Sequence, residues 1–203
     1  MSIANYADLL ASIASWLHRT NLTAQAPDFV ALAEARLARQ LRLQRMLVAT
    51  SGLNTVGGTG TVALPTRWVE WQRVRVATPN TPLEPLTPGQ FQGAYTATET
   101  GVPRNYTIEG NLMRLGPIPD AIYSIDGIYF QMPEALSVTT SNWLLTAHPG
   151  LYLWAALAEA APFIGADARL QLWEGKFNAD LEQARRLDDR ARFGGAALRQ
   201  RAR

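Results

Sequence analysis

The chain changes its hydrophobic period twice, and this change restricts its fold more than any other feature of the sequence. Apolar residues recur at helical spacing near both ends, whereas the middle holds most of the prolines, many glycines and short runs of β-favouring residues. Helices from the two ends bury their apolar faces most simply against each other. The sequence therefore predicts an α+β fold, a helical bundle from residues 1–45 and 140–192 with a β-rich module, 46–139, inserted between them. Residues 193–203 are predicted to form an extended C-terminal tail.

Two helices are predicted in the N-terminal segment, Ser2–Arg45. The first carries an apolar stripe of Ile3, Tyr6, Leu9, Leu10, Ile13 and Leu17. Pro27 suits the first turn of the second helix, with Asp28 near its positive end. One face of that helix is expected to be lined by Phe29, Leu32, Ala33, Leu37 and Leu41. Four arginines wind around its other side: Arg36, Arg39, Arg42 and Arg45.

The C-terminal segment returns to helix. Ser141 or Asn142 can cap a short helix, Trp143–Ala147. A His148-Pro149-Gly150 break precedes an Ala/Leu-rich helix at Leu151–Ala161, and Pro162 with Gly165 is expected to end or kink that helix. A long final helix is marked by one apolar face: Leu170, Trp173, Phe177, Leu181 and Ala184.

The middle segment reads as a set of short strands. The predicted strands are Thr61–Leu64, Trp68–Val76, Asn105–Glu109, Leu112–Leu115 and Tyr123–Phe130. Tyr123–Phe130 carries bulky residues on both faces, which predicts a central strand. Gly110-Asn111 suits a tight hairpin turn. Thr87–Tyr95 is predicted to form a short helix that is capped by Thr87 and begins at Pro88.

Residues that could carry catalysis or bind a metal are scarce. Zero cysteines exclude disulfides, thiolate metal sites and cysteine nucleophiles. The two histidines, His18 and His148, lack metal-type spacing, and Gly57–Gly60 leads into a strand with no lysine nearby, which indicates a hairpin or flexible loop rather than a phosphate loop. We predict no catalytic residue, no cofactor, no metal and no enzymatic activity. A cell-wall hydrolase that uses Glu159 or Glu70 as its acid is a competing hypothesis.

Two residue groups offer contact surface instead of chemistry. Five aromatic residues are predicted to serve core or inter-subunit packing: Trp143, Tyr152, Trp154, Trp173 and Phe177. From Arg190 to Arg203 there are five arginines and no acids. This segment is a functionally silent basic end, a nucleic-acid contact or a peptide that docks in an acidic groove of a partner.

Five segments carry a family resemblance: PDFVALAEARLARQLR (Pro27–Arg42), GVPRNYTIEGNLMRLGPIPD (Gly101–Asp120), NWLLTAHPGLYLWAALAEAAPFI (Asn142–Ile164), DARLQLWEGKF (Asp167–Phe177) and RRLDDRARFGG (Arg185–Gly195). In their order and spacing they resemble the head-to-tail adaptor (connector) proteins of tailed bacteriophages. The likeness is greatest to the tail accessory factor of short-tailed phages.

The resemblance implies a structural virion protein and no enzyme. Such a protein forms a ring of twelve copies beneath the portal, extends the DNA channel and provides the platform for the tail. The implied partners are further copies of the chain, the portal protein and a tail nozzle or stopper protein, with DNA passing through the channel without specific binding. In such proteins the C-terminal segment reaches the portal, which gives a docking role to Arg190, Arg192, Phe193, Leu198, Arg199, Arg201 and Arg203.

The expected location is the head-tail junction of the virion, after assembly in the host cytoplasm. The N-terminus lacks the features of a signal peptide, and the longest apolar run, around Leu151–Ala161, is too short to cross a membrane. We therefore expect no membrane contact. The alternative is a nucleic-acid-binding protein that uses the arginines of Arg36–Arg45 and the basic tail, although the net charge of +2 is modest for that function.

Overall fold

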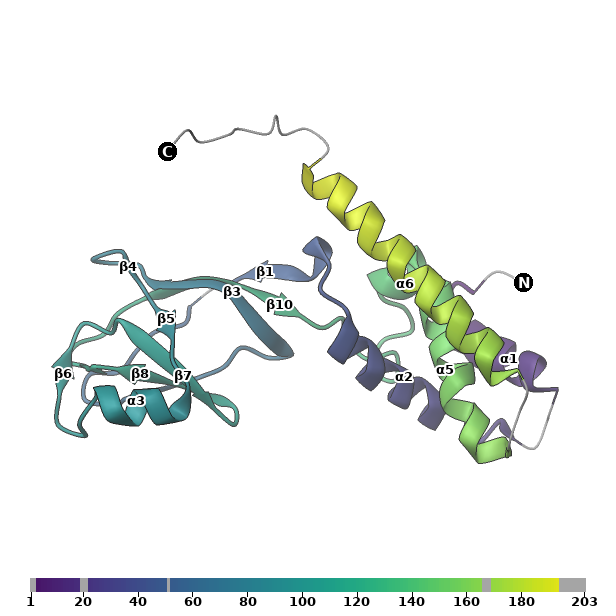
Figure 1. Cartoon of the computed structure of the whole chain (residues 1–203), viewed down its shortest axis with the longest axis horizontal. Coiled ribbons are helices and arrows are strands. Elements are labelled where there is room, and N and C mark those ends of the chain that lie inside the picture. The colour runs from purple at the N-terminus through teal and green to yellow at the C-terminus, as the bar shows by residue number, and fades with distance from the viewer. Residues whose placement is uncertain (1–2, 19–21, 51, 166–168, 194–203) are drawn as a thin grey trace. The chain divides into compact units, whose positions relative to one another are not determined.

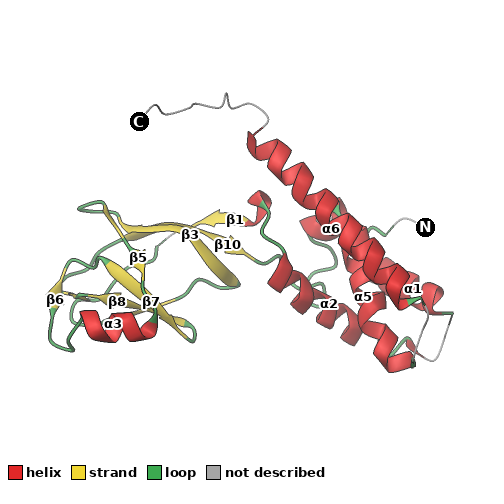
Figure 2. Cartoon of the chain, in the orientation of Figure 1, coloured by secondary structure: helices red, strands yellow, loops and turns green. Residues whose placement is uncertain are grey.

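The computed structural model describes residues 3–18, 22–50, 52–165 and 169–193 of the 203-residue chain (Figure 1). It divides into two compact units, Met1–Arg45 with Pro133–Arg203 and Met46–Met132, which we call the helical unit and the module. The predicted α+β fold, with helices from both chain ends and a β-rich insertion, is confirmed (Figure 2). The predicted C-terminal tail beyond Phe193 lies outside the described residues.

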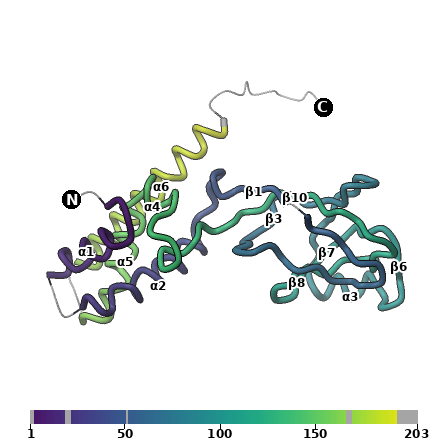
Figure 3. The backbone as a smooth tube through the Cα atoms, turned by 180° about the vertical axis from the view of Figure 1, so that it is seen from behind, coloured from purple at the N-terminus to yellow at the C-terminus, as the bar shows by residue number. Residues whose placement is uncertain are grey.

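The helical unit is organised around one central helix, α5. Its helices are α1 (Tyr6–Leu17), α2 (Ala26–Gln40), α4 (Trp143–Ala147), α5 (Pro149–Ile164) and α6 (Leu170–Phe193). Helices α1, α2, α4 and α6 all pack against α5 (Figure 3). Consequently α5 is buried on nearly all sides, through Leu151, Tyr152, Leu153, Ala155, Ala156, Leu157, Ala158, Ala160 and Ala161. The many alanines leave room for three long neighbouring helices at close-packed density.

Capping residues set several helix ends. Of the two predicted caps of α4, Asn142 holds the position, since its side chain accepts a hydrogen bond from the Leu145 amide at 2.9 Å. His148 both ends α4 and precedes α5, which begins at Pro149. Pro162 lies inside α5, and the helix continues to Ile164 before Gly165, whose φ of 89° favours glycine.

Most residues of the predicted apolar faces are buried, although Ile3, Tyr6, Leu10 and Leu170 are only half-buried. In α1 the buried apolar residues are Leu9, Ile13 and Leu17, and in α6 they are Trp173, Phe177, Leu181 and Ala184. In α2, Phe29, Ala33 and Leu37 of the predicted apolar face are buried, whereas Leu32 of the same face is 50% exposed. Val30 is buried instead, so the face that α2 turns to the core is centred near Ala33.

The described residues of the module form two four-stranded sheets and one two-stranded sheet. One sheet has the order β1-β10-β3-β4, with β1 (Leu47–Ala49), β10 (Ile125–Gln131), β3 (Trp68–Val76) and β4 (Thr81–Pro82). The second has the order β2-β8-β7-β5, with β2 (Thr61–Ala63), β8 (Leu112–Gly116), β7 (Asn105–Glu109) and β5 (Glu84–Pro85). The third pairs β6 (Thr100–Gly101) with β9 (Ile118–Pro119). The strand that was predicted to be central is β10, and it lies between β1 and β3.

Local signals placed the turns of the module correctly. Gly110, with a φ of 61°, turns β7 into β8, and a β-bridge between Val56 and Thr59 makes Gly57–Gly58 a hairpin turn. The predicted short helix is α3 (Pro88–Ala94), capped reciprocally by Thr87 and Gln90. The core is a single apolar cluster of Val62, Trp71, Val74, Val76, Leu83, Tyr106, Met113, Leu115, Ile125 and Tyr129.

The segment that follows the module returns to the helical unit before α4 begins. Leu136 is 1% exposed, and its amide donates a 2.9 Å hydrogen bond to the Glu34 carboxylate of α2. These contacts explain why Pro133–Thr139, which the sequence places with the β-rich module, lies in the helical unit here. Among the described residues, no helix is long and apolar enough to cross a membrane.

Candidate assembly surfaces

The five aromatic residues singled out from the sequence occupy two kinds of position. Tyr152, Trp173 and Phe177 are fully buried in the helical unit. Trp143 and Trp154 are half-buried. The Trp154 ring meets the ring of Trp16, which is 44% exposed, edge to face at 5.1 Å, and the Trp143 ring lies beneath the Arg45 guanidinium at 5.0 Å. These two half-buried rings therefore lie where the helical core meets its surface.

An ion cluster joins α2, α5 and α6. The Arg36 guanidinium donates two hydrogen bonds to the Glu174 carboxylate, at 2.8 and 2.5 Å, and lies 3.5 Å from the Glu159 carboxylate. It also stacks over the Phe177 ring at 4.3 Å. The hydrogen bonds from Arg36 lower the pKa of the Glu174 carboxyl, and those with Glu174 raise the pKa of the guanidinium. A paired, planar contact of this kind holds three helices in one register.

The other three arginines that were predicted to wind around the second helix, Arg39, Arg42 and Arg45, differ in their contacts. The Arg42 guanidinium donates to the carbonyl oxygens of Ala38 and Leu41, at 3.0 and 2.6 Å, and so caps the end of α2. Arg45 lies over Trp143, whereas Arg39 is exposed. The arginines therefore do not form one continuous solvated face of the kind that tracks a phosphate backbone. Because this depends on partners distant in sequence, the spacing alone could not reveal it.

A second cluster of polar contacts joins the segment before α4 to Glu34 of α2 and to Tyr152 of α5. Burial raises the pKa of the Glu34 carboxyl, and the hydrogen bond from the Leu136 amide opposes that rise. The Asn142 side-chain amide donates to the Tyr152 hydroxyl at 2.9 Å and to the Glu134 carbonyl at 2.9 Å. Burial also raises the pKa of the Tyr152 hydroxyl well above its ordinary range. These contacts are structural, since each polar group already serves a neighbouring segment.

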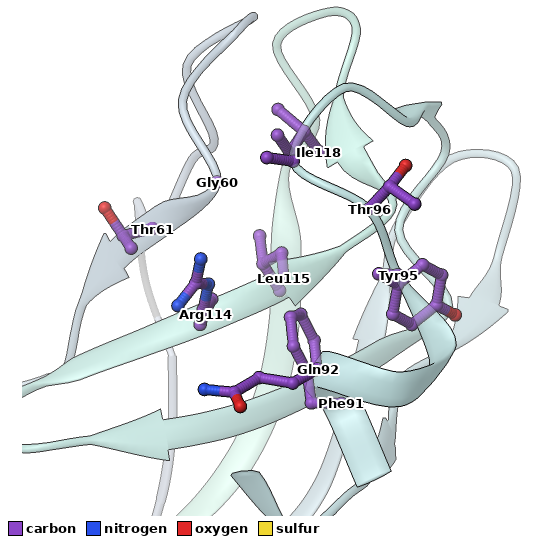
Figure 4. A pocket seen from close by; sticks show the side chains of 10 residues that line it. Gly60, Thr61, Phe91, Gln92, Tyr95, Thr96, Arg114, Leu115 and Ile118 are labelled. Atoms are coloured by element: carbon purple, nitrogen blue, oxygen red, sulfur yellow. The ribbon is translucent and has the colours of Figure 1, made fainter. Parts of the chain in front are cut away.

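The module carries a surface cavity of about 400 Å³ beside α3 (Figure 4). Its floor is apolar, with the buried residues Phe91 and Leu115, and Tyr95 and Ile118 lie along its wall. Arg114 is the charged residue of the lining, and its guanidinium lies 5.8 Å from the Phe91 ring and 3.3 Å from the Glu109 carboxylate. A cavity with this lining suits an apolar side chain of a partner better than a reaction.

The residues considered for catalysis or metal binding lie apart from one another. His18 ends α1, and His148 lies between α4 and α5, where burial lowers its pKa. Glu159 faces Arg36, and Glu70 lies on the module strand β3. Within the described part of the chain, no group of three histidine, aspartate or glutamate side chains is placed to share a metal ion.

The basic C-terminal residues are described only in part. Arg190 and Arg192 are exposed in the last turn of α6, where cations oppose the negative end of the helix dipole. Phe193 is the last residue of that helix. Leu198, Arg199, Arg201 and Arg203 lie outside the described residues.

Comparison with known proteins gives a match to a family model over nearly the whole chain. The model of a family described as SU10 adaptor protein matches residues 4–201, so the match includes both the helical unit and the module. A search of curated proteins finds no match.

Proposed function

This chain belongs to the SU10 adaptor protein family, and we therefore propose that it forms a ring beneath the phage portal, extends the DNA channel and carries the tail. The chain is a bacteriophage adaptor protein and a structural component of the virion. The ring, the portal contact and the platform for a tail nozzle or stopper are the proposed details. Twelve copies are the expected number, with assembly in the host cytoplasm.

The observation that carries the proposal is the extent of the family match. A match over residues 4–201 includes the N-terminal helices, the inserted module and α6 together, so it concerns the whole architecture rather than one motif. A ring also requires each copy to present two different, complementary surfaces. The large exposed apolar residues of α1, α2, α5 and α6 supply contact area for such surfaces.

A structural role also fits the charged residues better than a hydrolase does. Glu159 lies beside the Arg36 guanidinium, and Glu70 is an exposed strand residue. A catalytic pair of carboxylates needs a shared cleft with room for substrate. We infer that the protein has no catalytic role.

The basic C-terminal segment is proposed to dock on the portal. It carries five arginines and no acids from Arg190 onward, and arginine suits persistent contacts to carboxylates and backbone carbonyls. The docking residues are proposed to be Arg190, Arg192, Phe193, Leu198, Arg199, Arg201 and Arg203. Since Arg36, Arg42 and Arg45 hold partners within the helical unit, we propose that passing DNA meets the ring without specific binding.

The test is native mass spectrometry of the protein mixed with the portal ring from the same genome. We expect a discrete complex with one adaptor for each portal subunit, which is lost when the chain is truncated after Phe193. A matched variant that changes Arg199, Arg201 and Arg203 to glutamine keeps the length and should weaken binding, whereas the same three changes to lysine should weaken it less. Unchanged portal binding by the truncated chain would overturn the docking role. Salt-sensitive DNA binding without portal association would favour the nucleic-acid alternative.

A further inference from the structure

We infer that two separate apolar patches of the helical unit pair with each other between neighbouring copies of this chain. The inference rests on the proposed ring and assigns the surfaces that close it. One patch lies on α2 and the end of α5, and we call it the α2 patch. The other lies on the start of α6 and the end of α1, and we call it the α6 patch.

The α2 patch consists of Leu32 and Phe163, with Asp28 beside them. Leu32 is 50% exposed and Phe163 is 59% exposed. The Phe163 ring packs edge to face on the buried Phe29 ring at 5.7 Å, and Leu32 follows Phe29 by one helical turn. Asp28 precedes Leu32 by one turn and is exposed. The patch is therefore an apolar surface with the Asp28 carboxylate at one end, and Arg36, which is paired with Glu174, follows Leu32 by one turn at the other end.

The α6 patch consists of Leu172 and Trp16, with Lys176 beside them. Leu172 is 53% exposed and Trp16 is 44% exposed. The Arg169 guanidinium donates to the Trp16 carbonyl at 3.0 Å and so brings the start of α6 beside the end of α1. Leu172 follows Arg169 by one turn, and the exposed Lys176 follows Leu172 by one turn. This patch is an apolar surface with an ammonium group at one side.

The two patches lie on different sides of α6. Glu174 faces α2, because its carboxylate binds Arg36. Leu172 precedes Glu174 by two residues, and at about 100° for each residue its side chain points roughly 160° away from that direction around the helix. The α6 patch therefore faces away from α2. A single copy cannot join its own two patches.

Their chemistry is complementary between copies. Pairing the α2 patch of one copy with the α6 patch of the next covers four exposed apolar side chains and sets Asp28 against Lys176. Pairing two α6 patches would instead bring two basic surfaces together, and pairing two α2 patches would leave the Asp28 carboxylates without the Lys176 ammonium groups. A contact between two different patches is heterologous, and such contacts close into a ring when the rotation between neighbouring copies divides a full turn. The apolar area supplies affinity, and the charges supply orientation.

The absence of cysteine from the sequence allows a direct test by disulfide cross-linking. A chain with Leu32→Cys and Leu172→Cys is assembled on the portal, oxidised and separated without reductant. We expect a ladder of covalent multimers, at least tenfold more abundant than from a control with Leu32→Cys and Leu187→Cys. Leu187 is 48% exposed on the same helix but lies about four turns further on. Equal ladders from both pairs, or no ladder from the first pair, would overturn the inference.

Lys176 is the only lysine of the sequence, which makes a second test specific. Carbodiimide joins a carboxylate to an amine without a spacer, so the ring should yield a cross-link between Asp28 and Lys176 that disappears in Lys176→Arg and in Asp28→Asn. Lys176→Glu should reduce ring yield by roughly tenfold, through like charges at the contact, and adding Asp28→Lys should restore it. Failure of the exchanged pair to assemble, while both single variants melt at the temperature of the parent chain, would contradict the pairing.

Native mass spectrometry of the same samples distinguishes failure of the proposed ring from failure of the proposed patch pairing. If no multimer of the parent chain forms on the portal, the proposed ring fails, and the pairing fails with it. If the multimer forms but oxidation does not join the thiols introduced by Leu32→Cys and Leu172→Cys, the ring stands and only the pairing of these patches is wrong.

Discussion

The helical unit and the module hold themselves together in different ways. In the helical unit, segments far apart in the sequence are tied by buried or half-buried polar contacts, such as Arg36 with Glu174 and the Leu136 amide with Glu34. In the module, ion pairs lie at the surface, as between Arg75 and Asp126 at 3.4 Å, and a compact apolar cluster forms the core. Apolar packing forms both cores. Charged side chains add ties between distant segments in the helical unit, whereas neutral groups do so in the module, where the buried Thr55 hydroxyl donates to the Ala121 carbonyl at 3.0 Å and accepts from the Tyr123 amide at 2.7 Å.

The largest expected effect comes from emptying the core of the helical unit. Trp173 is fully buried, so Trp173→Ala should lower the free energy of unfolding by about 3–5 kcal/mol. Urea denaturation followed by circular dichroism measures this loss. Leu172→Ala is the matched control, because its side chain is 53% exposed and its truncation should change stability by less than about 0.5 kcal/mol. Similar losses from both variants would mean that α6 is not packed as described.

An overpacking change tests the module. A methyl group on Gly127 of β10 would lie 2.7 Å from the Trp71 ring and 3.0 Å from the Arg73 carbonyl oxygen. Gly127→Ala should therefore cost about 1–3 kcal/mol, with faster hydrogen exchange in the strands β3 and β10. Gly89→Ala is the control, since nothing lies within 4 Å of the added methyl group. Faster exchange that is equal in both units would show that they unfold as one.

Removing the ion cluster tests the polar ties. Arg36→Met keeps most of the side-chain length but leaves Glu174 and Glu159 without their shared cation. Since the cluster is partly exposed, we expect a loss of about 1–2 kcal/mol, between the values for surface and buried pairs. Arg39→Met, at an exposed position one turn later, should have little effect.

The contact between Arg36 and Glu174 should also make stability depend on pH. The hydrogen bond from Arg36 lowers the pKa of Glu174 in the folded protein. The contact therefore stabilises the fold above the ordinary glutamate pKa, and this stabilisation is lost as the pH falls through the lowered pKa.

The smallest expected effect has the opposite pH sign. Burial raises the pKa of Glu34, so folding favours its protonated form, and this contribution to stability is present at acid pH and is lost as the pH rises through the raised pKa. Glu34→Gln keeps an oxygen acceptor for the Leu136 amide but does not ionise. We expect the variant to be more stable than the parent chain at pH values above the raised pKa, and the difference to shrink as the pH falls below the ordinary glutamate pKa. Parallel stability curves of the two proteins across these pH values would refute the assignment.

Local structure was largely predictable from the sequence. Caps and turn residues predicted the positions of α3, α4 and the hairpin at Gly110. The spacing of the apolar residues predicted the positions of the long helices and of the central strand β10. The two-residue strands, such as β4 and β5, were missed because so few residues carry no period and because Pro82 and Pro85 argue against strands.

The contacts that polar residues make with distant parts of the folded chain were not predictable from the sequence. The arginines of α2 recur at a spacing typical of a solvated face, yet Arg36 pairs with a glutamate 138 residues further along the chain. Leu32 and Phe29 look equivalent in sequence, but only the packing of α5 decides which one is buried. The candidate assembly surfaces depend on such differences, so the sequence could name the aromatic residues and the tail but not the two apolar patches.

The place where the chain leaves and re-enters the helical unit bears on how such genes recombine. The module begins after Arg45 and ends before Pro133, so the backbone passes between the units twice. A single crossover within the module's part of the coding sequence would join one parent's α1 and α2 to another parent's α5 and α6, and would place Arg36 and its partners Glu159 and Glu174 in different products. Two crossovers, one at each passage, would exchange the whole module and keep the bundle of one parent intact. Exchange of the whole module, with one crossover at each passage, therefore disturbs the contacts of the helical unit least.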